Sequence, residues 1–239
     1  MTTKDHYDNH LADLYEWMSG DFDIKRKEQQ VFFEQHNIFP PENKIAIDLG
    51  AGHGLQSISL ANLGFSVKAI DFNKKLLHDL SKRSADLDIE IIEADILDLN
   101  KFVKSAGLIV CMGDTMSHIE STELLHQLIE RCYHTLQVKG KLILSFRDYS
   151  TELEDTTRII PVRSDNEKIF TCLLEYFKDK IRVTDMLYYK SGGSWQFKAS
   201  SYMKLRISAD LISTSISESG FKVLSTDTIN GMVYIISSK

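Results

Sequence analysis

The chain has 239 residues, of which 43% are hydrophobic and 26% charged, and its formal net charge is −6. This composition excludes a disordered chain, a collagen-like chain and a small disulfide scaffold, and it predicts one large domain or one domain with an elaboration. The negative charge gives no electrostatic reason to bind a polyanion, so we expect a small-molecule substrate and no nucleic acid as partner.

The cysteines and the first residues indicate the compartment. Cys111, Cys132 and Cys172 are odd in number and lack the C-x-x-C spacing of a thiolate zinc site, which favours a reducing environment. The opening MTTKDHYDNH lacks the apolar stretch of a signal peptide, and no segment approaches the ~20 apolar residues of a membrane span. We therefore expect a cytoplasmic protein that has no membrane partner.

Residues 1–40 are predicted to form an N-terminal helical lid. Two helix-like stretches flank Ser19-Gly20-Asp21, and apolar residues recur at helical spacing from Leu11 to Met18. Pro40-Pro41 then ends helical structure.

Residues 41–150 alternate between short apolar runs and helical patterns. The runs predict strands over 44–49, 66–70, 89–93, 108–111 and 142–146, and helices are expected over 55–63, 73–84 and 123–136. Asn73 is a good N-cap for the second helix, and Lys139-Gly140 is predicted to be a turn. This alternation is typical of parallel β–α units in a doubly wound sheet.

The pattern changes after Tyr149. Residues 151–207 resemble short alternating strands, with a tight turn at Asp179-Lys180 and a looser one over 191–194, which predicts an antiparallel insertion that covers the substrate. Residues 208–239 would end the core with a helix, stopped by Gly220, and a closing hairpin at the edge of the sheet. The expected fold class is α/β, with a mostly parallel, doubly wound, seven-stranded sheet.

A glycine-rich segment, DLGAGHG at 48–54, follows the first strand and opens a helix. Such a backbone can approach a ligand closely, and the helix N-terminus can face negative charge. Leu55 or Ser57 occupies the third glycine position of the dinucleotide pattern G-x-G-x-x-G, and the G-K-[ST] of a P-loop is missing. An acidic residue followed by G-x-G-x-G resembles the first motif of the class I S-adenosylmethionine-dependent methyltransferases.

Two further acids extend this resemblance. Asp71 ends the second strand, where a carboxylate can accept hydrogen bonds from both ribose hydroxyls, as it also would in an NAD enzyme. Asp95 ends the third strand, where the acid in this methyltransferase family accepts from the adenine amino group and the next residue packs on the ring. The resemblance covers about 44–149 and 208–238, and it implies S-adenosylmethionine as cofactor. The cofactor-binding residues that it implies are Tyr15, Trp17, Asp48, Gly50, Ala51, Gly52, Asp71, Phe72, Asp95, Ile96, Cys111, Met112 and Gly113.

The stretches 111–119 and 146–149 resemble the glycine and sarcosine N-methyltransferases, which read approximately C-x-G-N-S-x-x-H-L and D-H-R-N-Y there. The resemblance implies that Arg147 and Tyr149 contact the substrate, and the planar fork of an arginine suits a carboxylate. Tyr202, in the predicted insertion, is a further candidate substrate residue, because aromatic walls suit a sulfonium or an amine. Asp114 replaces the asparagine of that pattern, so the acceptor contacts differ and glycine is not implied. His118 and Asp114 are the candidate catalytic bases or orienting groups.

We therefore predict a methyltransferase, monomeric or homodimeric, that methylates an N or O atom of a small amine- or carboxylate-bearing metabolite. Alignment and desolvation can supply much of the rate of such an in-line displacement, so a dedicated base is not obligatory. One alternative is a noncatalytic S-adenosylmethionine-binding regulatory protein. Another is an NAD-dependent oxidoreductase, which the missing third glycine and Asp95 disfavour. Nothing in the sequence implies a metal.

Overall fold

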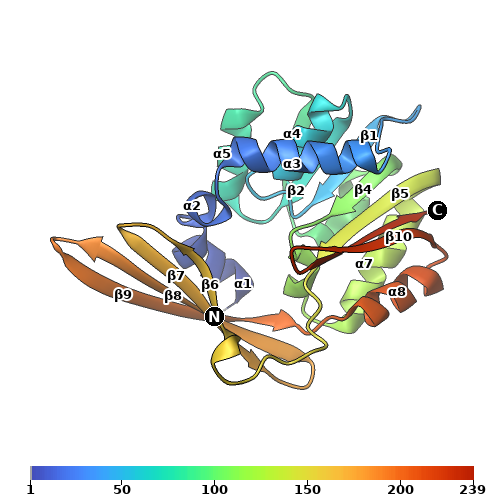
Figure 1. The fold of residues 1–239 in the computed structure, drawn as a ribbon. Coiled ribbons are helices and arrows are strands. Elements are labelled where there is room, and N and C mark those ends of the chain that lie inside the picture. The colour runs from blue at the N-terminus through green and yellow to red at the C-terminus, as the bar shows by residue number, and fades with distance from the viewer. Residues whose placement is uncertain (1) are drawn as a thin grey trace.

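The computed structural model describes residues 2–239 and contains two sheets (Figure 1). The first has seven strands: β1 (Ile45–Leu49), β2 (Ser66–Asp71), β3 (Ile89–Glu93), β4 (Ala106–Cys111), β5 (Leu136–Phe146), β10 (Lys222–Ile229) and β11 (Met232–Ser238). Their order is β10-β11-β5-β4-β1-β2-β3, with parallel pairing from β5 to β3 and antiparallel pairing at β11 and β10. The predicted fold class is confirmed.

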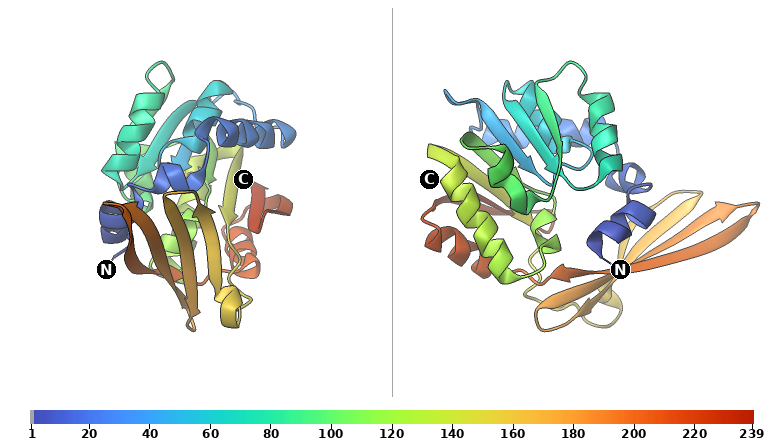
Figure 2. Two further views of the ribbon diagram at one scale, coloured as in Figure 1. Left: turned by 60° about the vertical axis from the view of Figure 1, so that its left-hand side comes forward. Right: turned by 180° about the vertical axis from the view of Figure 1, so that it is seen from behind.

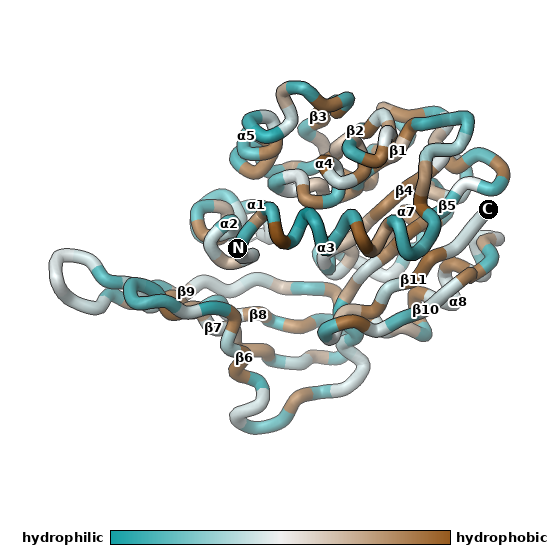
Figure 3. The backbone as a smooth tube through the Cα atoms, turned by 45° about the horizontal axis from the view of Figure 1, so that its top comes forward, coloured by the Kyte–Doolittle hydropathy of each residue, from teal (hydrophilic) through white to brown (hydrophobic). Residues whose placement is uncertain are grey.

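Helices cover both faces of this sheet, because its central strands bury apolar side chains on both sides. One face packs against α7 (Thr122–Thr135) and α8 (Ala209–Glu218), and the other against α3 (Phe22–Gln35) and α4 (Leu55–Asn62). The six residues of β4 are all buried, and hydropathy along the chain follows this burial (Figure 3). Helix α5 (Lys74–Arg83) packs beside α4, and three short helical segments complete the layers: η2 (Ile96–Asp98), α6 (Leu99–Phe102) and η3 (Thr115–His118). None of the helices within residues 2–239 is long and apolar enough to cross a bilayer.

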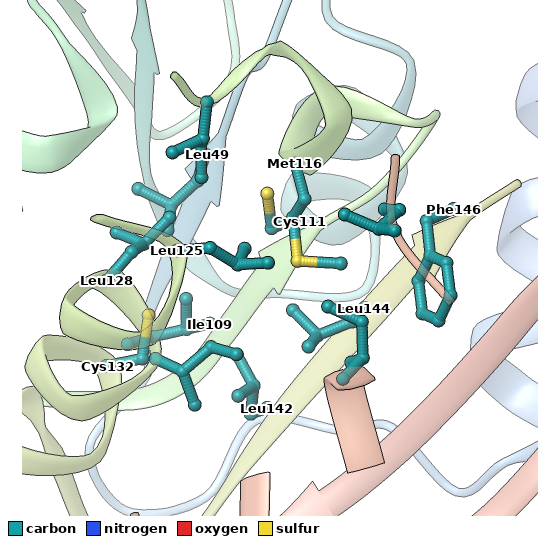
Figure 4. Packing of buried hydrophobic residues seen from close by; sticks show 14 of the residues in the cluster. Leu49, Ile109, Cys111, Met116, Leu125, Leu128, Cys132, Leu142, Leu144 and Phe146 are labelled. Atoms are coloured by element: carbon teal, nitrogen blue, oxygen red, sulfur yellow. The ribbon is translucent and has the colours of Figure 1, made fainter. Parts of the chain in front are cut away.

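The core beneath β4 and β5 contains the thiol of Cys111. Figure 4 shows Cys111 packed among Met116, Leu125 and Leu144, and the residue is 1% exposed. The thiol therefore contributes to packing in the core. Met112, the next residue, packs in the hydrophobic cluster on the opposite face of the sheet.

The second sheet is an antiparallel meander of β6 (Ile159–Ser164), β7 (Lys168–Tyr176), β8 (Lys180–Ser191) and β9 (Ser194–Leu205), and η4 (Asp155–Arg158) precedes it. It projects from one side of the core (Figure 2). Its strands are longer than the sequence pattern indicates, since 181–184 and 186–189 belong to one strand. Only the face turned toward the N-terminal helices is largely buried, through residues such as Val183 and Tyr202.

Two predicted turns differ from the structure. Lys139-Gly140 lies inside β5, because Lys139, at a φ of 65°, donates its backbone N–H to the carbonyl of Lys239 and the strand continues. The expected loose turn over 191–194 is a two-residue turn, since Ser191 pairs with Ser194. Gly192 and Gly193 have φ values of 59° and 78°, which two-residue hairpin turns require and glycine adopts without strain.

The N-terminal helices lie between the two sheets (Figure 2). They are α1 (Thr3–His6), the π-helical turn η1 (Tyr7–Leu11) and α2 (Tyr15–Ser19), followed by α3. The imidazole of His6 anchors them to the second sheet through hydrogen bonds of 2.9 Å to Asp185 and 2.8 Å to Ser200, and it stacks on Tyr202. A second anchor is the indole of Trp17, whose N–H donates to Asp165 at 2.6 Å.

On the opposite side these helices contact His53 of the glycine-rich segment. The rings of Tyr15 and Phe22 meet the imidazole edge-on at 5.0 and 5.1 Å, and the imidazole is 6% exposed. Burial, with a smaller contribution from Arg83, lowers the pKa of His53 to about 4. At neutral pH the imidazole is therefore uncharged, as its aromatic surroundings require.

We expect the free energy of unfolding to fall as the pH is lowered from about 6.5 to about 4. Between these pH values His53 is protonated in the unfolded chain but not in the folded chain, so protonation favours unfolding. His53 contributes at most about 3 kcal/mol at 1.36 kcal/mol per pKa unit. Urea titrations at several pH values should show a weaker pH dependence for His53→Gln. The exposed His78 provides the control His78→Gln, and an unchanged pH dependence in His53→Gln would contradict the assignment.

Candidate active site

Two adjoining cavities open at the edge of the seven-stranded sheet where β1, β2, β3 and β4 end. The glycine-loop cavity, of about 610 Å³, lies between the glycine-rich segment, the ends of β2 and β3, and the N-terminal helices. The interlayer cavity, of about 780 Å³, lies between those helices, the ends of β4 and β5, and the inner face of the second sheet. Their common wall consists of Tyr7, Tyr15, Leu55, Gln56, Met112, Gly113 and His118.

The glycine-rich segment forms the floor of the glycine-loop cavity. Gly50 has a φ of 79°, and a Cβ at this position would overlap the side chain of Thr115. Gly54 has a φ of 97° and stands at the N-terminus of α4, where a Cβ would overlap Leu80. The segment can therefore pass close to its neighbours only with glycine at these positions.

Asp48 supports this segment from below. It is 1% exposed, and it accepts a hydrogen bond of 2.6 Å from the hydroxyl of Ser57 in α4. Burial raises the pKa of Asp48 to about 7. The side chain lies behind the loop instead of lining either cavity as residues 2–239 define them, so it positions the loop without facing a ligand.

Asp71 is the last residue of β2 and Asp95 lies two residues after β3, and both line the glycine-loop cavity. Asp71 accepts backbone hydrogen bonds from Gly52 at 2.9 Å and Asn73 at 2.8 Å, so it also fixes the shape of the loop. Burial raises the pKa of Asp71 above its usual value, although these N–H groups oppose the shift. Asp95 is exposed, and one of its oxygens accepts from the backbone N–H of Leu97 at 2.8 Å. Phe72 and Ile96 follow the two acids and supply apolar walls.

Most of the predicted cofactor residues line the glycine-loop cavity: Tyr15, Gly50, Ala51, Gly52, Asp71, Phe72, Asp95, Ile96, Met112 and Gly113. Trp17 and Cys111, like Asp48, lie apart from it within the described residues. The indole of Trp17 is engaged with Asp165 and lies near the cations of Arg163 and Lys168. Cys111 faces the core because alternate residues of a strand point to opposite faces.

A buried ion pair joins the two sheets at the interlayer cavity. Asp114 follows β4 and Lys204 is on β9; their side chains are 8% and 11% exposed, and the ammonium lies 2.6 Å from the carboxylate. The carboxylate also accepts from the hydroxyl of Tyr149 at 2.8 Å and the backbone N–H of Arg147 at 3.0 Å. Burial disfavours both charges, yet the pairing outweighs it: the pKa of Asp114 is lowered and that of Lys204 is raised well above its usual value.

His118 stands in the wall between the cavities. Its Nε2 is 3.4 Å from the hydroxyl of Tyr7, and its ring stacks with that of Tyr202 at 5.8 Å between centroids. The Nδ1 atom is buried and has no hydrogen-bond partner among residues 2–239. Burial and the nearby ammonium of Lys204 lower the pKa of His118 to about 3, so the imidazole is neutral and only weakly basic.

The three predicted substrate residues also line the interlayer cavity. Arg147 is exposed, its guanidinium lies beside Gly231 in the turn between β10 and β11, and within the described chain this guanidinium makes no hydrogen bond or ion pair. Tyr149 and Tyr202 are 5% and 6% exposed and form its aromatic wall. The interlayer cavity is therefore lined by two cations: Arg147, which is exposed, and Lys204, which is buried and paired with Asp114.

Lys204 is one residue of this region that the sequence predictions omit. A signal for Lys204 exists, because Ser200, Tyr202 and Lys204 alternate along β9 and share the face turned toward the cavity. Tyr7 is one of the aromatic side chains that the sequence places in the predicted N-terminal lid. Its place in both cavities follows from the π-helical turn that packs between the sheets.

Comparisons with known proteins agree with this geometry. Residues 46–140 match the family described as a methyltransferase domain. A glycine/sarcosine N-methyltransferase from Aphanothece halophytica is 24% identical over 115 residues, which cover 47% of this chain and 43% of that protein. A mitochondrial ubiquinone biosynthesis O-methyltransferase from Schizosaccharomyces pombe is 28% identical over 145 residues, covering 54% and 50%. The chain spans between 24% and 58% of the length of the curated relatives it matches.

A solved structure extends the likeness to nearly the whole chain. CalS10, an amino pentose methyltransferase from Micromonospora echinaspora with S-adenosylmethionine bound, superposes with a TM-score of 0.78 at 11% identity and covers 95% of each chain. Similarity at this level of identity shows the fold alone. Together with the match over 46–140, it establishes that the chain resembles the class I S-adenosylmethionine-dependent methyltransferases and has their fold.

Proposed function

We propose that the protein transfers a methyl group from S-adenosylmethionine to an N or O atom of a small amine- or carboxylate-bearing metabolite. The observation that carries this proposal is the wall shared by the two cavities. One cavity has the carboxylates and glycine backbone that suit an adenosyl ligand, and the other has a separate set of polar and aromatic groups. A cofactor in one cavity and an acceptor in the other would meet beside Tyr7, Met112 and His118, which line both cavities. Direct group transfer requires such contact between the two ligands.

The donors and acceptors of the glycine-loop cavity fit the cofactor. Asp71 would accept from the ribose hydroxyls, and the free oxygen of Asp95 from the adenine amino group, with Phe72 and Ile96 against the ring. The backbone at Gly50 and Gly52 would lie along the methionine tail, near Tyr15 and Gly113. S-adenosylmethionine supplies an electrophilic methyl group when it is bound there.

The side chains of the interlayer cavity would bind and orient the acceptor. The free guanidinium of Arg147 suits a carboxylate, which it can hold through two parallel hydrogen bonds. Tyr149 and Tyr202 would form the walls. Asp114 is held by three donors and His118 is weakly basic, so their role in this proposal is to position the acceptor and its neighbours, while exclusion of water and alignment supply the rate acceleration.

Calorimetric titration with S-adenosylmethionine, S-adenosylhomocysteine and NAD tests the cofactor. We expect micromolar binding of the two adenosyl sulfur ligands and none of NAD, whereas binding of NAD alone would contradict the proposal. Turnover with a panel of amine and carboxylate metabolites then separates an enzyme from a noncatalytic binding protein. Binding without methylation of any member of the panel would favour the regulatory alternative.

Asp71→Asn should weaken S-adenosylmethionine binding by about 1.5–3 kcal/mol, which is roughly 10- to 150-fold. The substitution keeps the size of the side chain but removes the charge that favours hydrogen bonds from the ribose hydroxyls and from Gly52. Glu93→Gln, at the paired position on β3, is the matched control, because Glu93 lies outside the cavity lining among residues 2–239. Equal affinities for wild type and Asp71→Asn would refute the ribose assignment.

Arg147→Lys should lower kcat/KM for the acceptor at least tenfold, mostly through KM. A lysine keeps the positive charge but cannot form the bidentate contact that a guanidinium makes with a carboxylate. Affinity for S-adenosylmethionine should stay that of the wild type, since Arg147 faces only the interlayer cavity in the described structure. Steady-state kinetics with the acceptor found by the screen provide the measurement, and an unchanged kcat/KM would exclude the carboxylate contact.

A further inference from the structure

We propose that the interlayer cavity takes an organic acid with an apolar body, and that the ammonium of Lys204 holds the ionised oxygen that receives the methyl group. This inference rests on the proposed function and narrows its acceptor from an N or O atom to an ionised oxygen. Lys204 is thereby assigned as a substrate-binding residue that determines which acceptors react.

The position of Lys204 supports this assignment. Its side chain comes from β9 into the interlayer cavity, and its Nζ lies 5.9 Å from the centre of the Tyr202 ring. Of the three N–H bonds of the ammonium, one is taken by the carboxylate of Asp114. The remaining N–H bonds can donate to a ligand, and an ionised oxygen is the strongest acceptor for them.

The charges around Lys204 also bear on the chemistry of the acceptor. The ring of Tyr202 lies 5.9 Å from the Lys204 ammonium, and the hydroxyl of Tyr149 donates to the same carboxylate, Asp114, so this site already holds one positive charge. A cationic amine acceptor would have to stand beside this ammonium and beside the sulfonium of the cofactor. The other buried carboxylate of the cavity, Asp185, has one oxygen hydrogen-bonded with His6 and the other with Cys172, at 2.9 Å each. The oxygens of both buried carboxylates therefore already have hydrogen-bond partners, and a cationic acceptor would find no unpartnered buried carboxylate among the described residues of this cavity.

Among the described residues, the wall between the two cavities contains no strong base. His118, with a pKa of about 3, is too weak to take a proton from an ammonium or from an ordinary hydroxyl. Asp114 is stabilised in its charged form by Lys204, by Tyr149 and by a backbone N–H, so it is a poor proton acceptor as well. Among the described residues at this wall, the groups present suit an acceptor that arrives already ionised.

The step is balanced without a proton transfer. The bond that forms joins the acceptor oxygen to the methyl carbon, and the bond that breaks joins that carbon to the sulfonium sulfur. The electron pair of the broken bond stays on sulfur, so the anionic oxygen and the cationic sulfonium both become neutral. Once the oxygen has lost its charge it no longer pairs with Lys204, which favours release of the product.

The size and lining of the cavity indicate the rest of the acceptor. A volume of about 780 Å³ lies in the upper part of the usual range for small-molecule sites, about 300–1,000 Å³. Apolar side chains from four parts of the chain line it: Leu11 and Met18, Val31 and Phe32, Ile160, Val162, Phe170 and Leu174, and Ile229 and Met232. A ligand as small as glycine would leave most of this surface in contact with water, whereas an aromatic or aliphatic acid would cover it.

The test uses 4-nitrophenol, a phenol that ionises near neutral pH and whose phenolate absorbs visible light. With S-adenosylhomocysteine bound to the protein, no methyl transfer occurs and only binding and ionisation of the probe are observed. We expect the bound phenol to have a pKa lower than in water by about one unit or more, because an ammonium lies within contact distance. We also expect 4-nitrobenzylamine, which carries a positive charge, to bind at least tenfold more weakly.

Variants assign the effect to Lys204. Lys204→Met alone leaves Asp114 buried without its partner and can impair folding, so the double variant Lys204→Met/Asp114→Asn, which removes both charges, is measured beside it. Both should lose the pKa shift of the probe, and Lys204→Arg should keep at least part of it. The matched control is Lys198→Met on the same strand, since Lys198 contacts the carbonyl of Asn9 and lines neither cavity among residues 2–239.

Three outcomes would overturn the inference: no binding of 4-nitrophenol, tighter binding of 4-nitrobenzylamine, or a pKa shift that survives in the double variant. Each outcome is interpreted only after every variant has been shown to bind S-adenosylhomocysteine with the affinity of the wild type. Failure of the wild type to bind S-adenosylhomocysteine contradicts the proposed function itself, so the two failures are distinguished by the first titration.

Discussion

The ion pair between Asp114 and Lys204 is the interaction on which the arrangement of this protein depends most. It links the loop after β4 in the seven-stranded sheet to β9 in the second sheet, 90 residues later in the chain. Two charges that are about nine-tenths buried cost free energy to desolvate, and the pair recovers it only if the geometry is held. Tyr149 and the backbone N–H of Arg147 hold it, so the segment after β5 is fixed by the same carboxylate. Removing one charge alone would leave the other unpaired, at a cost of about 3–5 kcal/mol.

This geometry explains why the site lies where it does. The strands β1 to β4 end at one edge of the sheet, which leaves backbone groups and the acids after β2 and β3 facing outward. The ion pair holds the second sheet opposite this edge, and the N-terminal helices fill the space between them. His6 and Trp17 fasten these helices to the second sheet, whereas His53 meets them from the glycine-rich segment. Both cavities are therefore bounded by contacts between segments distant in the sequence.

Local patterns in the sequence predicted those parts of the molecule that depend on local physics. Buried parallel strands give apolar runs, Asn73 caps α5 through its side chain, and the glycine-rich turn needs positive φ values. The parts that were missed depend on long-range contacts. Lys139 continues β5 because its backbone pairs with Lys239, a contact that no local pattern contains. Trp17 was expected at the cofactor from an N-terminal pattern, but Asp165 on the connection between β6 and β7 draws its indole away. Lys204 shares a face of β9 with Tyr202, but its pairing with Asp114, 90 residues earlier in the chain, is not visible in any local pattern.

The N-terminal helices have a consequence for both binding sites. Tyr7 and Tyr15 belong to the walls of both cavities, and a single short segment, which includes one π-helical turn, carries them. A displacement of this segment would therefore change the lining of both cavities at once. A ligand that fixes Tyr7 or Tyr15 in one cavity also fixes part of the wall of the other, so the two binding sites share these side chains.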